Sequence, residues 1–155
     1  MGKNPLTILL VEDDPAHAEI VRRNFGDFFS ENRLEHVADG RAALDYLYRR
    51  GAFSDVRRAP RPDLVLLDLR LPGIDGFTVL RTVKEDASLA SIPVVVLTTS
   101  AAEIDVSRAY THRANSYLVK PVDFDEFVAL MESLGHYWFD KNRFPGAPEE
   151  GALRG

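Results

Sequence analysis

The sequence contains no cysteine among its 155 residues and no long apolar run. Without cysteine the chain can form neither disulfides nor thiolate metal sites, and a reducing compartment is compatible with it. The apolar run near the N-terminus is too short for a signal peptide, and no other stretch is long enough to cross a bilayer. We therefore expect a cytoplasmic protein without a membrane partner.

Basic residues form no dominant cluster in this sequence. The 19 Lys and Arg residues are outnumbered by 24 Asp and Glu residues, which gives a net charge of −5. Arginines gather between residues 49 and 61, but Asp55 lies among them and Asp63 lies next to them, as is typical of a solvated loop. We therefore expect no nucleic-acid partner. The length and the hydrophobic content of 45% fit one globular domain.

Apolar runs typical of strands alternate with segments of helical periodicity along the chain. The runs cover residues 6–11, 34–38, 64–67, 94–97 and 116–119. Aspartates suited to cap helices open the segments that follow four of these runs, and they are Asp14, Asp39, Asp75 and Asp123. This alternation predicts βαβ units, and hence a doubly wound α/β fold with a parallel five-stranded sheet and helices on both faces.

The residues that end these runs carry most of the functional information. They are Glu12 and Asp13 after the first run, Asp68 after the third, Thr98 after the fourth and Lys120 after the fifth. In a parallel sheet these ends lie at one edge, where open α/β folds bind their ligands. Neighbouring carboxylates repel each other, and Mg²⁺ is the ion that suits a few carboxylates together with a phosphate. The pattern predicts a magnesium site that accepts a phosphoryl group.

Each of these residues alone has an ordinary structural explanation. Acids after the first run can cap a helix, and an aspartate before Leu-Pro-Gly can form a turn. Thr98 can be a β-branched strand residue, and Lys120 a surface cation. Their joint occurrence, each at a strand end, favours one shared site over four separate explanations.

Four motifs carry a resemblance to a known family, and they are VEDD at 11–14, DLRLPGIDG at 68–76, VVVLTTSA at 94–101 and SYLVKP at 116–121. With these motifs the chain resembles the receiver domain of two-component response regulators. The resemblance implies a flavodoxin-like strand order 2-1-3-4-5 and a phosphoacceptor role for Asp68. Such a protein is not an enzyme, although it assists its own phosphorylation and dephosphorylation.

The same resemblance implies roles for the residues around Asp68. Glu12 and Asp13 would hold Mg²⁺ together with Asp68 and the backbone carbonyl of Arg70. Thr98 and Lys120 would contact the phosphoryl oxygens, and Tyr117 would act with Thr98 as the switch by rotating inward from solvent. The Lys120–Pro121 peptide should be cis. Arg70 and Ser100 flank the site at variable positions, so we expect them to influence the rate of phosphate loss.

Less specific motifs give the chain a resemblance to the stand-alone regulators that partner bacterial phytochrome kinases. They are the long loop at 50–62, TTSAAEIDVSRAY and the ending HYWFDKN. This resemblance implies a sensor histidine kinase of the phytochrome type as partner. It also implies a receiver domain at 1–134 followed by a C-terminal arm at 135–155, without a separate output domain.

The arm contains aromatic residues, and the sequence leaves open what they pack against. Gly135 should weaken the last helix, and Tyr137, Trp138 and Phe139 follow it. Either these side chains fold back over the helix, or they form a homodimer contact that adjoins Tyr117.

Three other functions compete with the phosphoacceptor. An FMN protein shares the sheet order, but the acids at 12–14 would repel the phosphate of its ligand. A phosphatase with an aspartate nucleophile would need a second aspartate at position 70, where this chain has Arg70. A receiver-like module that binds partners, or a phosphate sink without a phosphorylation-driven output, stays as the alternative.

Overall fold

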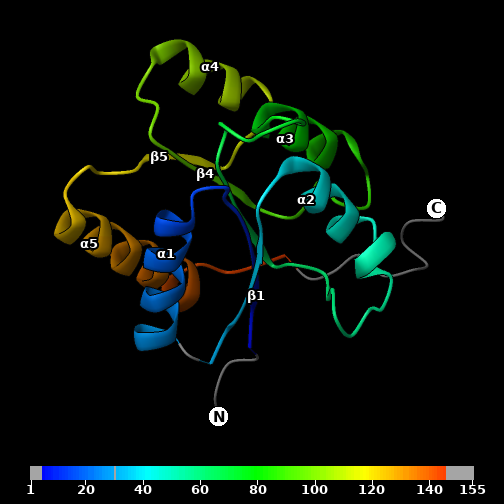
Figure 1. Cartoon of the computed structure of the whole chain (residues 1–155), viewed down its shortest axis with the longest axis horizontal. Coiled ribbons are helices and arrows are strands. Elements are labelled where there is room, and N and C mark those ends of the chain that lie inside the picture. The colour runs from blue at the N-terminus through cyan, green and yellow to red at the C-terminus, as the bar shows by residue number, and fades with distance from the viewer. Residues whose placement is uncertain (1–4, 30, 146–155) are drawn as a thin grey trace.

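A computed structural model describes residues 5–29 and 31–145, in which a parallel sheet lies between two layers of helices (Figure 1). The strands are β1 (Thr7–Val11), β2 (Arg33–Val37), β3 (Leu64–Leu67), β4 (Val94–Thr98) and β5 (Ser116–Val119). Their order is β2-β1-β3-β4-β5, and every neighbouring pair is parallel. The predicted fold class and strand order are confirmed.

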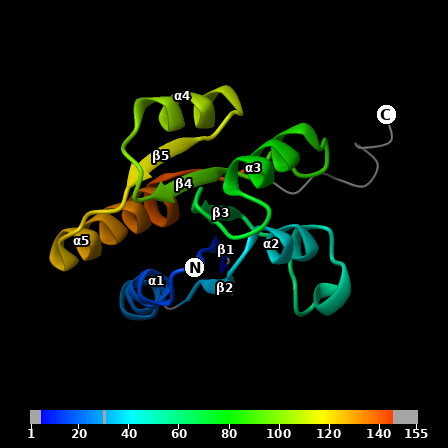
Figure 2. The same ribbon diagram turned by 45° about the horizontal axis from the view of Figure 1, so that its top comes forward.

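Two helices cover one face of the sheet and three cover the other (Figures 1 and 2). The first layer is α1 (Pro15–Phe28) and α5 (Phe124–Gly135), and the second is α2 (Gly40–Leu47), α3 (Gly76–Glu85) and α4 (Glu103–Thr111). Successive side chains of a strand point to opposite faces. Ile8 and Leu10 therefore pack against α1 and α5, whereas Leu9 and Val11 pack against the other layer. This two-sided burial explains the continuous apolar runs of the central strands.

Aspartates begin four of the five helices, as the sequence predicts. In α1 the Asp14 carboxylate accepts a hydrogen bond from the Ala16 N–H at 2.9 Å, and Asp75 does the same for Thr78 in α3. Asp39 and Asp123 cap α2 and α5. These caps satisfy backbone donors that a helix leaves unpaired in its first turn. They fix where each chain segment leaves the carboxyl edge of the sheet.

Helix α5 ends at Gly135, as far as regular α-helical geometry is concerned. The chain does not leave the helix there but continues directly into a π-helical segment, η2 (His136–Lys141). Gly135 is required there because a Cβ at this position would overlap the Phe29 ring. Phe139 of η2 is buried, with its ring edge-to-face against Phe25 and Phe29 at centroid distances of 5.4 and 5.0 Å. For Phe139, therefore, the alternative that folds back is the one observed.

Some features of the chain could not be predicted from its sequence. Phe124, the first residue of α5, is 61% exposed. The long loop at 50–62 contains a 3₁₀ turn, η1 (Gly51–Phe53), and is held down by a hydrogen bond from the Tyr46 hydroxyl to the Pro60 carbonyl at 2.9 Å. Residues 146–155 of the predicted arm lie outside the described residues.

Within the described part of the chain, no helix combines the length and apolar character that a membrane span requires.

Candidate functional site

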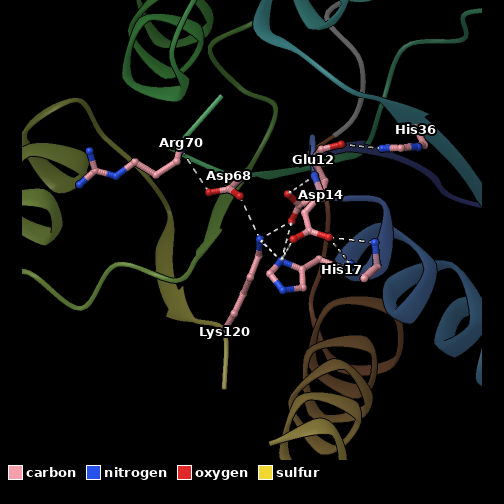
Figure 3. A network of polar contacts seen from close by, with 8 residues as sticks. Glu12, Asp14, His17, His36, Asp68, Arg70 and Lys120 are labelled. Atoms are coloured by element: carbon pink, nitrogen blue, oxygen red, sulfur yellow. Dashed lines mark hydrogen bonds and ion pairs between the residues drawn. The ribbon is translucent and has the colours of Figure 1, made fainter. Parts of the chain in front are cut away.

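The residues that directly follow β1, β3 and β5 meet at one point at the carboxyl edge of the sheet. The Glu12 N–H donates to the Val37 carbonyl at 3.0 Å, and the Asp68 N–H donates to the Val11 carbonyl at 3.0 Å. The Lys120 N–H likewise donates to the Thr98 carbonyl at 2.7 Å. The sheet ladder thus continues just past each strand, so these side chains are held by backbone pairing rather than by flexible loops. The His36 imidazole also donates to the Glu12 carbonyl at 2.7 Å and anchors the end of β1 (Figure 3).

The Lys120 ammonium is the centre of the polar network at this edge (Figure 3). Its side chain is buried, and its Nζ donates to Asp68 Oδ2 at 2.9 Å and to Glu12 Oε1. The third partner is His17 Nδ1 at 3.0 Å. An ammonium has three N–H donors, and here each has an acceptor. The buried charge of Lys120 is therefore fully paired.

The two buried carboxyl groups respond differently to this environment. Burial raises the pKa of Glu12 to about 7, although the hydrogen bond and charge of Lys120 oppose that rise. Burial also acts to raise the pKa of Asp68, but the hydrogen bond and charge of Lys120, with a further hydrogen bond from the Arg70 N–H, hold it below its usual value. Asp68 is therefore a carboxylate at neutral pH, which is the nucleophilic form.

The acidic residues fit a divalent cation. Glu12, Asp13 and Asp68 each offer a carboxylate oxygen, and these oxygens lie within 4.8 Å of one another. Glu12 and Asp68 are buried, whereas Asp13 is exposed and leaves the solvent side open. Magnesium prefers oxygen ligands and retains several waters when bound by few carboxylates. The donor set and its one open side match this preference.

The predicted switch residues lie beside this pocket. Thr98 is fully buried at the end of β4, and its hydroxyl has no hydrogen-bond partner among the described residues. Tyr117 on β5 is half-buried, and its hydroxyl donates to the Ser100 carbonyl at 2.8 Å. This hydrogen bond ties the Tyr117 ring to the segment that follows β4. The rotation of Tyr117 as part of the switch stays a prediction.

The structure also connects residues that sequence reasoning left separate. Arg70 Nη2 donates to Asp105 Oδ2 at 2.7 Å, and the Ser100 hydroxyl donates to the same oxygen at 2.6 Å. Asp105 lies in the first turn of α4 and is 8% exposed. Nothing in the sequence pairs position 70 with position 105, because the contact depends on how α4 docks. Both flanking residues of the site are thus tied to α4.

The four residues predicted to form a dimer interface differ in how far they are exposed to solvent. Tyr137 is 55% exposed, Trp138 and Tyr117 are half-buried, and Phe139 lies in the core of its own chain.

The prediction of a cis Lys120–Pro121 bond is wrong, since no cis peptide occurs among the described residues. The trans isomer is the one that X–Pro bonds ordinarily favour, by about 0.5–1 kcal/mol.

Receiver modules of signalling proteins combine this strand order with an acidic pocket at the carboxyl edge, and the pocket between β1 and β3 places the chain in that class. The chain belongs to the response regulator receiver domain family, whose model matches residues 8–132. Members of this family act in two-component signalling and are not ordinary enzymes.

Relatives by sequence include two proteins that the chain matches over nearly their whole length. It is 46% identical to the probable methanogenesis regulatory protein FilR2 of Methanothrix harundinacea, over 94% of this chain and 91% of that protein. It is 36% identical to response regulator Rcp1 of Synechocystis, over 92% of this chain and 95% of Rcp1.

Solved structures show the same resemblance in three dimensions. The phosphorylated cyanobacterial phytochrome response regulator RcpA superposes with a TM-score of 0.87 at 33% identity, covering 92% of this chain and 99% of RcpA. The Mn²⁺-bound form of Rcp1 gives 0.86 at 36% identity, covering 92% of this chain and 100% of that one. The bacteriophytochrome response regulator RtBRR gives 0.71 at 41% identity, covering 97% and 89%.

Proposed function

We propose that this chain accepts a phosphoryl group on Asp68 from a sensor histidine kinase of the phytochrome type and signals through protein–protein contacts. The observation that carries the proposal is the buried Asp68 carboxylate at the end of β3, bonded to Lys120 beside the Glu12 and Asp13 acids. A nucleophile, a fixed cation and a metal-binding acid cluster are the parts that phosphoryl transfer requires.

The chemistry follows from the positions of these groups. An Asp68 oxygen attacks the phosphorus of a phosphohistidine, the P–N bond breaks, and the electron pair returns to the imidazole. The product is an acyl phosphate on Asp68. Lys120 Nζ, 2.9 Å from Asp68 Oδ2, is placed to donate to an oxygen of the transferred group. Mg²⁺, held by Glu12, Asp13, Asp68 and the Arg70 carbonyl, would neutralise charge on the phosphoryl oxygens.

The switch that we propose uses the Thr98 hydroxyl, which has no partner in the described part of the chain. A phosphoryl oxygen on Asp68 would accept a hydrogen bond from this buried donor, and satisfying a buried polar group stabilises the state in which it is satisfied. Movement of Thr98 changes the space beside Tyr117, whose packing then alters the surface at β5. Phosphorylation would thus act as a local charge change on a two-state element.

The phytochrome-type partner is supported by the relatives. RcpA and RtBRR are both named as phytochrome response regulators and match more than nine-tenths of this chain. FilR2, at higher identity, is named for methanogenesis regulation instead, so the kinase must be identified by experiment. The test measures the rate of phosphotransfer to this chain from each of a panel of autophosphorylated histidine kinases, phytochrome kinases included. The fastest donor identifies the partner kinase. Preference for a kinase without a phytochrome module would contradict this part of the proposal.

The phosphoacceptor is tested with acetyl phosphate, with and without Mg²⁺. Intact mass should rise by one phosphoryl group only when Mg²⁺ is present, and beryllofluoride should change the fluorescence of Trp138 or Tyr117. Asp68→Asn removes the nucleophile with little change of shape and serves as the control. If this variant gains the same mass, Asp68 is not the acceptor.

One observation favours the alternative, a module without a phosphorylation-driven output. The Tyr117 hydroxyl already bonds the Ser100 carbonyl, so this contact needs no phosphoryl group. Under the alternative, Asp68 would still gain mass, while the fluorescence would stay unchanged. The same experiment therefore separates the two functions.

A further inference from the structure

His17, a residue to which sequence reasoning assigns no role, lies against the Lys120 ammonium. Its Nδ1 is 3.0 Å from Lys120 Nζ (Figure 3). Because an ammonium can only donate, Nδ1 is the acceptor, and the ring proton of the neutral imidazole is then on Nε2. Of the three partners of Lys120, His17 is the one that is not a carboxylate.

The position of His17 is fixed by the chain around it. It lies in the first turn of α1, where its N–H donates to the Asp14 carboxylate at 3.3 Å. Its ring is half-buried and lies tilted on Phe127 of α5, with centroids 5.8 Å apart. The helix cap and the aromatic contact together hold Nδ1 toward the site.

We infer that His17 is a positioning residue that holds the Lys120 ammonium at Asp68, an inference that rests on the proposed function. In the reacting complex the other two partners have further tasks, since Glu12 serves the metal and Asp68 carries the phosphoryl group. His17 alone remains as a fixed acceptor for one Lys120 N–H. A neutral acceptor restrains the ammonium without cancelling the charge that the phosphoryl oxygens need.

The test compares rates of Asp68 phosphorylation by acetyl phosphate and Mg²⁺, followed by intact mass. His17→Phe keeps a ring to pack on Phe127 but has no acceptor, and His17→Ala removes both. We expect each variant to react roughly tenfold more slowly, the size of one lost hydrogen bond to a charged group. Thermal melts establish that the variants compared are folded, and the Ala variant serves if the Phe variant is not.

Repeating both substitutions in a Lys120→Met background separates positioning from other effects. If His17 acts through Lys120, its loss has no further effect once the ammonium is gone. A tenfold loss that persists in the Met background overturns the inference, as does a wild-type rate for the variants with Lys120 intact. In either case phosphorylation that depends on Asp68 leaves the proposed function standing, whereas labelling of Asp68→Asn would refute that function instead.

Discussion

The Thr98 hydroxyl is buried without a partner among the described residues, and this has a cost for stability. Thr98→Val replaces the hydroxyl with a methyl group of similar size. We expect the free energy of unfolding to rise by about 1 kcal/mol, because a desolvated polar group is removed. Beryllofluoride should then no longer change the environment of Tyr117.

Urea unfolding and fluorescence measure the two effects of Thr98→Val. The exposed neighbour Thr99 offers a matched control, since Thr99→Val should change stability by less than about 0.5 kcal/mol. A less stable Thr98→Val protein would indicate that the hydroxyl is satisfied in solution, and the proposed switch would lose its main support.

Gly135 illustrates a residue whose type is set by a neighbour distant in sequence. Gly135→Ala would drive a Cβ into the Phe29 ring, and overpacking of this kind costs about 1–3 kcal/mol. At Gly26, within α1, an added Cβ would instead meet open space, so Gly26→Ala should stabilise the helix by about 0.5–1 kcal/mol. Chemical denaturation of both variants checks the opposite signs, and equal destabilisation would refute the packing argument.

The predictability of site residues depended on how each one is placed. Glu12, Asp68 and Lys120 directly follow apolar strands, so their convergence could be predicted from the sheet alone. His17 and Asp105 reach the site from helices. Their contribution depends on helix docking and rotation, which no local pattern specifies. The packing of Gly135 against Phe29 was missed for the same reason, because it is a tertiary contact on which helix propensity carries no information.

At the scale of elements, hydrogen bonds to Asp105 hold α4 against the residues that flank the site. This carboxylate accepts from both Arg70 and Ser100, while the Ser100 carbonyl accepts from Tyr117. Asp105→Asn removes the charge that pairs with Arg70. We expect faster amide hydrogen exchange in the first turns of α4 and in the segment around Ser100, because the ion pair and its hydrogen bonds fix their docking.

Glu103 provides the control for that experiment. It is also an acid in the first turn of α4, but it is exposed. Glu103→Gln therefore loses the same favourable interaction with the helix dipole without breaking the contact to the site. If the two variants show equal exchange, the dipole rather than the Arg70 contact explains the stability of α4.

The elements themselves were largely predictable because local signals agree with the fold. Strand runs and aspartate caps were placed within one or two residues of their observed ends, as for β2, predicted at 34–38 and observed at Arg33–Val37. The continuation of α5 into η2 could not be predicted in this way. It is stabilised by Phe139 packing on Phe25 of α1 and on Phe29 just after that helix, which is an interaction between segments far apart in the sequence.

At the scale of the molecule, η2 completes the hydrophobic layer formed by α1 and α5. A chain shortened after Leu134 would lose Phe139, and removal of one buried Phe side chain costs about 3–5 kcal/mol. Such a truncation would therefore be strongly destabilised for a reason unrelated to assembly. A test of the predicted homodimer needs point substitutions on exposed residues instead.

The last prediction is that copies of this chain pair through the exposed side of η2. Tyr137 is 55% exposed and lies edge-to-face on Trp138 with centroids 5.3 Å apart. Together with Leu118 and Leu130 these residues line a groove beside β5, the edge strand of the sheet. Exposed apolar surface of this kind marks interfaces, and a two-fold axis would bring the same patch together from both copies.

We expect light scattering at micromolar concentration to report the mass of two chains for the unsubstituted protein, and the mass of one chain for Tyr137→Asp. Tyr110→Asp, on α4 across the sheet and 50% exposed, should leave the dimer intact. If the unsubstituted chain is a monomer with and without beryllofluoride, the dimer is refuted.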